Sequence, residues 1–200
     1  MLIVVGGHSR NIGKTSVVCG IISSLADRRW TAIKVTQYGH GVCSHEGEPC
    51  ECADPIHPVA VSRETGAHPG TDSGRFLEAG AEESYWVRTA AGNLGEAMPR
   101  LRAMLRSGGN VILESNSILQ FAKPDVCLMV VDGSVMDFKK SSLRFLDRAS
   151  AIVDTSGAPF AWPNVSPTLL ASRRVIRAAA PEYRSTELTE FIESRWPALA

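Results

Sequence analysis

Residues 6–16 read Gly-Gly-His-Ser-Arg-Asn-Ile-Gly-Lys-Thr-Ser and constrain the fold more than any other segment of this chain. An apolar run at 2–5 precedes them, and an apolar, helix-compatible run at 17–26 follows. Strand, glycine-containing turn and helix, in this order, are the context that a phosphate-binding loop requires. Backbone N–H groups in such a loop form a concave nest, and the helix dipole adds about half a positive charge. The segment therefore predicts an anion site where the first helix begins.

Side chains of the loop indicate how a nucleotide would be held. Lys14 would reach the β- and γ-phosphates, and the Thr15 hydroxyl would bind Mg²⁺. Five residues separate Gly7 from Gly13, one more than in the common pattern, so His8 stands where the first glycine is expected. The alternative interpretation is a structural turn that happens to contain Gly-Lys-Thr. The predicted nucleotide-binding residues are Asn11, Ile12, Gly13, Lys14, Thr15 and Ser16.

Charge and hydropathy exclude several classes of function. The chain has 21 basic and 21 acidic residues, so its net charge of zero argues against broad electrostatic binding to nucleic acid or to an anionic membrane. No apolar run approaches the ~20 residues that span a bilayer. The N-terminus lacks the basic region of a signal peptide. We expect a cytoplasmic protein whose five cysteines stay reduced.

Apolar segments alternate with helical patterns, which predicts an α/β fold, specifically a three-layer P-loop NTPase with a mainly parallel sheet. We expect one domain over residues 1–200, with an insertion rich in cysteine and histidine at about 39–72. Predicted strands occupy 2–6, 31–36, 85–89, 110–114, 126–132 and 150–154. Predicted helices occupy 14–26, 56–65, 73–80, 93–106, 137–147, 167–178 and 185–195.

Carboxylates near strand and helix ends are candidate ligands for Mg²⁺. Glu114 ends a predicted apolar strand, at the edge where open α/β sheets bind ligands, and is otherwise an ordinary strand-end glutamate. Asp72 is the second candidate, or else the N-cap of the next helix. With Lys14, these two are the predicted catalytic residues. Asp132 either contacts the nucleotide or caps a turn, and Lys34 either touches phosphate or is an exposed lysine at a strand end.

The insertion gathers residue types that bind metal. Three of the five cysteines and four of the five histidines lie between residues 40 and 68. Zn²⁺ takes four thiolate and imidazole ligands, which Cys43, Cys50, Cys52 and a histidine such as His45 would supply. Soft thiolates also suit an iron–sulfur cluster, which two subunits of a dimer could share. The alternative is a connecting loop whose thiols are incidental.

Several segments together resemble the molybdopterin-guanine dinucleotide biosynthesis protein B family. Residues 7–16 look like its phosphate loop, and residues 33–40 resemble its second strand and the histidine-rich turn after it. Residues 72–81 are similar to its Asp-Ser/Thr-x-Arg-x-x-x-Ala-Gly-Ala segment, the most specific match. Residues 111–114 correspond to its Walker B strand. The resemblance covers roughly residues 1–135.

This resemblance implies a deviant-loop P-loop fold that binds GTP and Mg²⁺. It also implies a homodimer that assists the attachment of GMP to the molybdenum cofactor, with an enzyme of that biosynthesis as partner. By position, Gly13, Lys14 and Thr15 would hold phosphates and Mg²⁺, and Asp72 and Glu114 would serve the metal.

The chain also departs from the family pattern. The cysteine-rich insertion is absent from that pattern, and residues 115–117 read Ser-Asn-Ser where a glycine and an aromatic residue are usual. No Asn-Lys-x-Asp guanine signature appears, and residues 151–157 end a strand where it would stand.

We therefore predict a weak NTPase that binds a purine nucleotide, GTP rather than ATP, and hydrolyses it slowly. One alternative is an ATP-dependent small-molecule ligase resembling dethiobiotin synthetase, whose loop has the same Gly-x5-Gly-Lys-Thr spacing. Such a ligase needs a substrate pocket near Lys34. The other alternative is a metal-binding carrier or insertion module whose release is gated by nucleotide.

Overall fold

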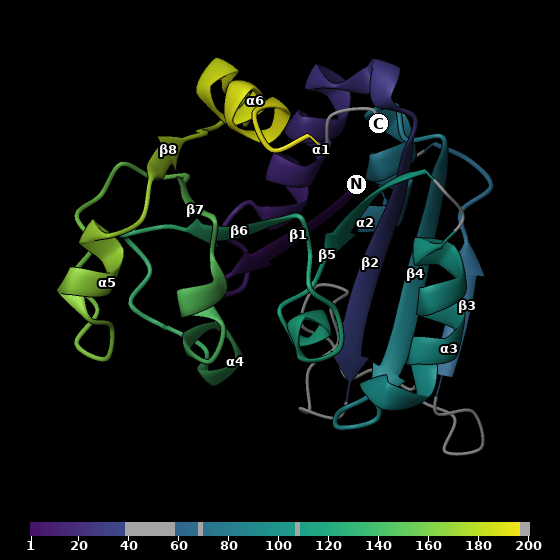
Figure 1. Cartoon of the computed structure of the whole chain (residues 1–200), viewed down its shortest axis with the longest axis horizontal. Helices are drawn as coiled ribbons and strands as arrows, with labels where there is room; N and C mark the ends of the chain where they lie inside the picture. Colours follow the sequence, from purple (N-terminus) through teal and green to yellow (C-terminus); the bar gives the residue numbers. More distant parts are fainter. Residues whose placement is uncertain (39–58, 68–69, 107–108, 197–200) are drawn as a thin grey trace.

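The computed structural model describes residues 1–38, 59–67, 70–106 and 109–196, and it contains one eight-stranded sheet (Figure 1). The strand order is β3-β4-β2-β5-β1-β6-β7-β8, and every neighbouring pair is parallel except β3 and β4. The strands are β1 (Leu2–Gly7), β2 (Trp30–Tyr38), β3 (Val59–Arg63), β4 (Glu83–Ala90), β5 (Asn110–Glu114), β6 (Val126–Val131), β7 (Ala151–Asp154) and β8 (Val175–Arg177).

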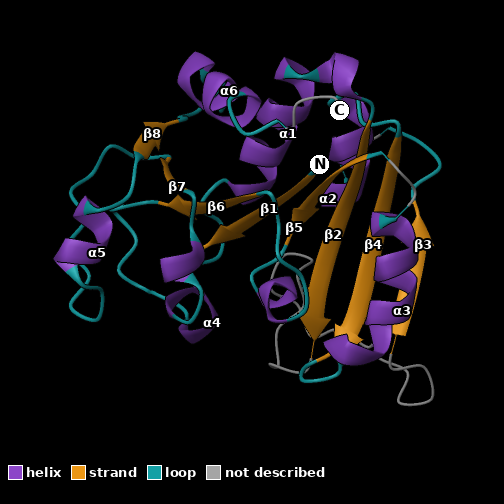
Figure 2. Ribbon diagram, viewed as in Figure 1, coloured by secondary structure: helices purple, strands orange, loops and turns teal. Residues whose placement is uncertain are grey.

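Helices cover both faces of this sheet (Figure 2). They are α1 (Lys14–Ser24), α2 (Asp72–Glu78), α3 (Leu94–Leu105), α4 (Lys140–Leu143), α5 (Pro167–Ala171) and α6 (Thr186–Glu193). Side chains of α1, α2 and α6 share one buried cluster, and those of α3 belong to a cluster on the opposite face. In β1, Ile3 and Val5 join the first cluster and Val4 joins the second. Burial on both faces explains why the strands read as continuous apolar runs.

A third cluster packs against β6 and β7. Met129 and Ile152 contribute from the strands, and Leu146, Trp162 and Leu170 cover them. Helix α5 therefore lies over the β7 side of the sheet, far along the strand order from α3. The predicted α/β architecture of three layers with a mainly parallel sheet is confirmed.

The prediction was wrong for three helices. Within the predicted helix 56–65, Val59–Arg63 form strand β3, which pairs antiparallel with β4. The predicted helix 167–178 stops at Ala171, because Val175–Arg177 form strand β8 and bury Ile176 completely. Only Lys140–Leu143 of the predicted helix 137–147 is α-helical. In the first two segments, strand pairing, which is non-local, overrides the local helical pattern.

Much of the predicted insertion at 39–72 falls outside the described residues. Cys43, His45, Cys50 and Cys52 all lie in the undescribed stretch 39–58, so the predicted zinc or iron–sulfur ligands stay a prediction. The described remainder adds the edge strand β3 to the sheet and leads into α2.

Strand register assembles the site. The carboxyl ends of parallel strands meet at one edge of the sheet, and Glu114 of β5 is the register partner of both Val5 in β1 and Lys34 in β2. The loop between β1 and α1 leaves from the same edge. Residues far apart in the sequence are thereby brought beside the start of α1.

Candidate phosphate-binding site

The loop before α1 exposes backbone N–H groups at a helix start. Asn11 (φ 54°) and Gly13 (φ 83°) adopt left-handed conformations, which glycine tolerates best and asparagine better than most residues. Gly13 is the N-cap of α1, and among the described residues no side chain accepts a hydrogen bond from this helix start. By contrast, hydroxyls cap α2, α5 and α6, namely those of Thr71, Ser166 and Ser185. The first N–H groups of α1 therefore have no capping side chain among the described residues, and such groups can bind an anion.

Lys14 lies along this loop. Its aliphatic chain runs over Gly7, where an added Cβ would stand 2.4 Å from Lys14 Cδ. Its ammonium donates a hydrogen bond to the Ser9 carbonyl oxygen at 2.7 Å. Burial lowers the pKa of Lys14, because removing water disfavours the charged form. A phosphate group would offer this ammonium a charged partner in place of a neutral carbonyl.

Asn116 fixes the start of the loop. Its Oδ1 accepts from the Gly7 N–H at 2.8 Å, and its Nδ2 donates to the Gly7 carbonyl oxygen at 3.0 Å. Nδ2 also donates to Ser142 Oγ at 2.8 Å, and that hydroxyl donates to the same Gly7 carbonyl at 2.6 Å. Since Ser115 N–H already bonds Val5 O, the amide of Asn116 continues the contact between β1 and the chain after β5 by a side chain. Sequence reasoning noticed residues 115–117 only as a departure and missed this anchor.

His8 anchors the other side of the loop. Its ring is fully buried, Nε2 lies 3.1 Å from the Val135 carbonyl, and the rings of Phe138 and Trp162 lie 5.1 and 4.8 Å away. Burial lowers the pKa of His8, so the neutral form is favoured. The residue that replaces the expected first glycine therefore packs the loop against the segment after β6.

Positive charge gathers around the loop. Lys139 N–H bonds the His8 carbonyl at 2.9 Å, which places this lysine beside the loop. Burial, followed by repulsion from Lys14 and Arg10, lowers the pKa of Lys139 to about 8. Like charges held this close favour the binding of an anion between them.

The three predicted Mg²⁺ ligands, Thr15, Asp72 and Glu114, come together around Lys34. Thr15 Oγ1 donates to Glu114 Oε2 at 2.8 Å. The Lys34 ammonium lies 2.5 Å from Glu114 Oε1 and 2.7 Å from Asp72 Oδ2. Burial alone would lower the pKa of Lys34, but the charges of Glu114 and Asp72 outweigh it and raise that pKa. For Asp72 the same opposition has the reverse sign: burial alone would raise its pKa, but the charge of Lys34 outweighs burial and lowers that pKa.

The structure shows the structural roles of three residues for which the sequence left alternatives. Asp72 is not the N-cap of α2, because the Thr71 hydroxyl accepts from Gly74 N–H at 3.0 Å and Asp72 is the first helical residue. Lys34 is neither at a strand end nor exposed: β2 runs on to Tyr38, and the Lys34 side chain is 14% exposed. Asp132 caps a turn, since its carboxylate accepts from Ser134 N–H at 2.9 Å.

The oxygen atoms of Thr15, Asp72 and Glu114 form a donor set that fits Mg²⁺. This ion is usually held by one or two carboxylates together with substrate phosphates and water. Within the described ranges, no group of three or more His, Cys, Asp or Glu side chains is arranged to hold a metal. A cation at this edge would therefore need phosphate oxygens as further ligands.

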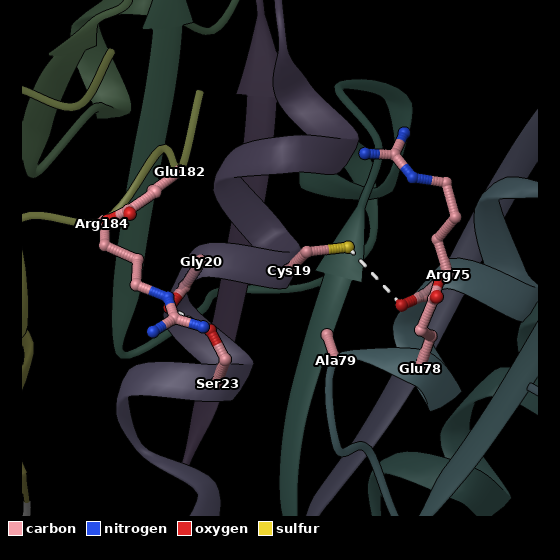
Figure 3. Close-up of a pocket in the computed structure, with 8 residues that line it drawn as sticks. All are labelled: Cys19, Gly20, Ser23, Arg75, Glu78, Ala79, Glu182 and Arg184. Atoms are coloured by element: carbon pink, nitrogen blue, oxygen red, sulfur yellow. Dashed lines mark hydrogen bonds between the residues drawn. The ribbon is translucent and has the colours of Figure 1, made fainter. Parts of the chain in front are cut away.

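A surface cavity of about 310 Å³ lies between α1, α2 and the segment before α6 (Figure 3). Cys19, Arg75 and Arg184 are among its lining residues, and Lys34 is not. The Arg184 side chain reaches across Ser23 of α1, whereas the Arg75 guanidinium points away from the cavity (Figure 3). The Arg75 guanidinium donates to Ser16 Oγ at 3.0 Å. Burial raises the pKa of Cys19 to about 11, so this thiol stays protonated and is a poor nucleophile.

The fold and the loop together define a class of site, a glycine-containing loop that joins a strand to a helix at the carboxyl edge of a parallel sheet, where open α/β sheets bind ligands. No protein-family model and no curated protein matches this sequence. Among solved structures, the chain is similar to HypB from Helicobacter pylori in complex with nickel, with 9% identity and a TM-score of 0.48 over 96% of this chain and 86% of that chain. It is also similar to the MinC:MinD cell division protein complex of Aquifex aeolicus, with 16% identity and a TM-score of 0.47 over 98% and 86%.

Similarity of this degree assigns no activity, ligand or partner to this chain. In the described part of the chain, no helix combines the length and apolar composition needed to cross a membrane.

Proposed function

We propose that this chain binds a purine nucleoside triphosphate with Mg²⁺ at the loop 8–16 and hydrolyses it slowly. The observation that supports this best is the start of α1: its first amides have no capping side chain among the described residues, and the Lys14 ammonium lies over the same loop. An uncapped helix start beside a buried cation is suited to phosphate rather than to a neutral ligand. The Thr15–Glu114 hydrogen bond places a candidate Mg²⁺ donor directly beside it.

The proposed roles follow from these positions. The loop amides and Lys14 would hold and neutralise the β- and γ-phosphates, and Thr15, Asp72 and Glu114 would hold Mg²⁺. When bound, Mg²⁺ would supply neutralisation of phosphate charge. Hydrolysis would then rely on positioning and charge neutralisation rather than on a covalent nucleophile, which is consistent with a slow reaction.

The preference for GTP over ATP rests on the sequence resemblance. The segment that follows β7 adjoins the loop, because Thr155 Oγ1 donates to the Ile12 carbonyl at 3.2 Å. Asp154, just before it, already accepts hydrogen bonds from Arg177 at 2.9 Å and from the Ser156 N–H at 3.0 Å. The homodimer and the part in molybdenum-cofactor guanylylation likewise rest on the sequence resemblance alone.

A nucleotide titration tests the proposal. Fluorescent GTP and ATP analogues are titrated into the full chain, once with Mg²⁺ and once with EDTA. Lys14→Ala should weaken binding by about 10- to 150-fold, because a hydrogen bond to a charged group contributes roughly 1.5–3 kcal/mol. Lys123→Ala, at an exposed position before β6, is the matched control and should bind like the parent protein.

The Mg²⁺ roles are tested in the same titration. Glu114→Gln should reduce the gain in affinity that Mg²⁺ gives, while affinity in EDTA changes less. If folded Lys14→Ala binds nucleotide as tightly as the parent protein, the phosphate site is refuted. If Glu114→Gln loses the same nucleotide affinity with and without Mg²⁺, the role of Glu114 is structural.

A further inference from the structure

Lys34 occupies the position between the two carboxylates of the proposed Mg²⁺ site. Its ammonium lies 2.5 Å from Glu114 Oε1 and 2.7 Å from Asp72 Oδ2. The register of β2 against β5 makes Lys34 and Glu114 cross-strand partners, and Asp72 comes from the start of α2. The Lys34 ammonium, which carries a single positive charge, therefore bridges the two carboxylates.

The carboxylates need such a partner. The Glu114 side chain is only 3% exposed, and Lys34 and Thr15 Oγ1 occupy its two oxygens. Two carboxylates that contact the same ammonium lie close enough to repel each other, and the ammonium between them offsets this repulsion. The pair is not closed on all sides, because the Asp72 side chain is 38% exposed. An incoming cation would reach the pair from the side of Asp72.

We propose that Lys34 is an internal counter-ion that keeps divalent cations off Asp72 and Glu114 until a nucleotide is bound. This inference rests on the proposed function. The ammonium and a divalent cation need the same two carboxylates, and at such distances they repel each other strongly. Lys34 has a flexible four-carbon chain, so it can leave the pair. Nucleotide phosphates provide the anionic partner that the displaced ammonium requires.

Divalent cation binding to the nucleotide-free protein distinguishes the two positions of Lys34. Without phosphate nearby, Lys34 stays on the carboxylates and a divalent cation binds poorly. With Lys34 replaced by a neutral side chain of similar length, the same carboxylates become an open pair of oxygen ligands. Removing the ammonium should then create metal binding in the absence of nucleotide.

The test measures Mn²⁺ binding to the nucleotide-free full chain by electron paramagnetic resonance at constant pH. Lys34→Met should bind one Mn²⁺ at least ~10-fold more tightly than the parent protein, because a repelling unit charge has been removed. Lys123→Met is the matched control and should behave like the parent protein. Adding Asp72→Asn to Lys34→Met should abolish the gain, which excludes binding elsewhere in the chain.

Thermal unfolding establishes that each variant is folded, and Lys34→Gln replaces Lys34→Met if the latter does not fold. Equal Mn²⁺ affinity in the parent protein and in folded variants of Lys34 would overturn the proposal. So would a gain that survives Asp72→Asn. The nucleotide titration in EDTA is independent of this experiment, so a failure of the proposed function is distinguishable from a failure of the role proposed for Lys34.

Discussion

Asn116→Ala is the perturbation whose magnitude the structure defines best. The change removes the Oδ1 atom that accepts from the buried Gly7 N–H at 2.8 Å, and it leaves the Gly7 carbonyl with Ser142 Oγ. A buried donor without a partner costs about 1–3 kcal/mol, and each further lost hydrogen bond about 0.5–1.5 kcal/mol. We expect a loss of roughly 2–4 kcal/mol in the free energy of unfolding. For a chain of 200 residues, this corresponds to roughly 4–16 °C in Tm.

Urea denaturation and differential scanning calorimetry measure this change. Ser117→Ala is the matched control, because it removes one half-buried hydrogen bond, from Ser117 Oγ to Gln37 Oε1 at 2.9 Å, and should cost about 1 kcal/mol or less. If Asn116→Ala is no less stable than Ser117→Ala, the anchoring role assigned to Asn116 is wrong.

A second variant tests the same contact from the other side. An added Cβ on Gly6 would lie 2.3 Å from Asn116 Oδ1, while its next non-Asn116 neighbour is Met129 Cε at 3.6 Å. Gly6→Ala should therefore destabilise the parent protein much more than it destabilises Asn116→Ala. Additive costs in the double variant would contradict this packing, since residues in contact couple by about 0.5–3 kcal/mol.

Two further predictions concern the loop. Gly13→Ala should cost more stability than Gly92→Ala by about 1–3 kcal/mol. Both residues have positive φ (83° and 89°), but an added Cβ at Gly13 would stand 2.6 Å from Tyr183, whereas at Gly92 it would meet no described neighbour. Equal urea midpoints would contradict this prediction. Binding of inorganic triphosphate should weaken as pH rises from about 7 to 9, because Lys139, whose pKa burial lowers to about 8, loses its charge. Lys139→Met should flatten that profile in calorimetric titrations, and an unaltered slope would exclude Lys139 from the anion site.

The sequence predicted those parts of the fold that local pattern determines. The central strands are apolar on both faces, so β1, β5, β6 and β7 stand out from their flanks. The edge strands lack this continuous apolar pattern. Strands β3 and β8 are half-exposed and short, and only pairing with a neighbouring strand distinguishes them from helix or loop. The wrong helices at 56–65 and 167–178 both arose there.

The same division applies to the site. The loop, Lys14 and Thr15 could be identified because a local motif carries them. Glu114 and Asp72 could be named as acidic residues near element ends, but their convergence depends on strand register and on where α2 begins. Lys34 was named as a candidate phosphate contact but not as the partner of Glu114, and Asn116 was missed, because these partners lie 80 and 109 residues away in the chain. Short-range pattern contains no signal for such contacts.

Long-range contacts also explain why a loop with an extra residue can still form a nest. Gly7 is held by Asn116, His8 by Val135 and the ring of Trp162, and Gly13 lies against Tyr183. Each anchor comes from a different segment, so the loop is fixed at its start and at its end before any ligand arrives. A prearranged nest loses little conformational entropy when an anion binds. The side chain of His8 fills space between the loop and the segment after β6, so the residue that stands in place of the expected first glycine is held by packing.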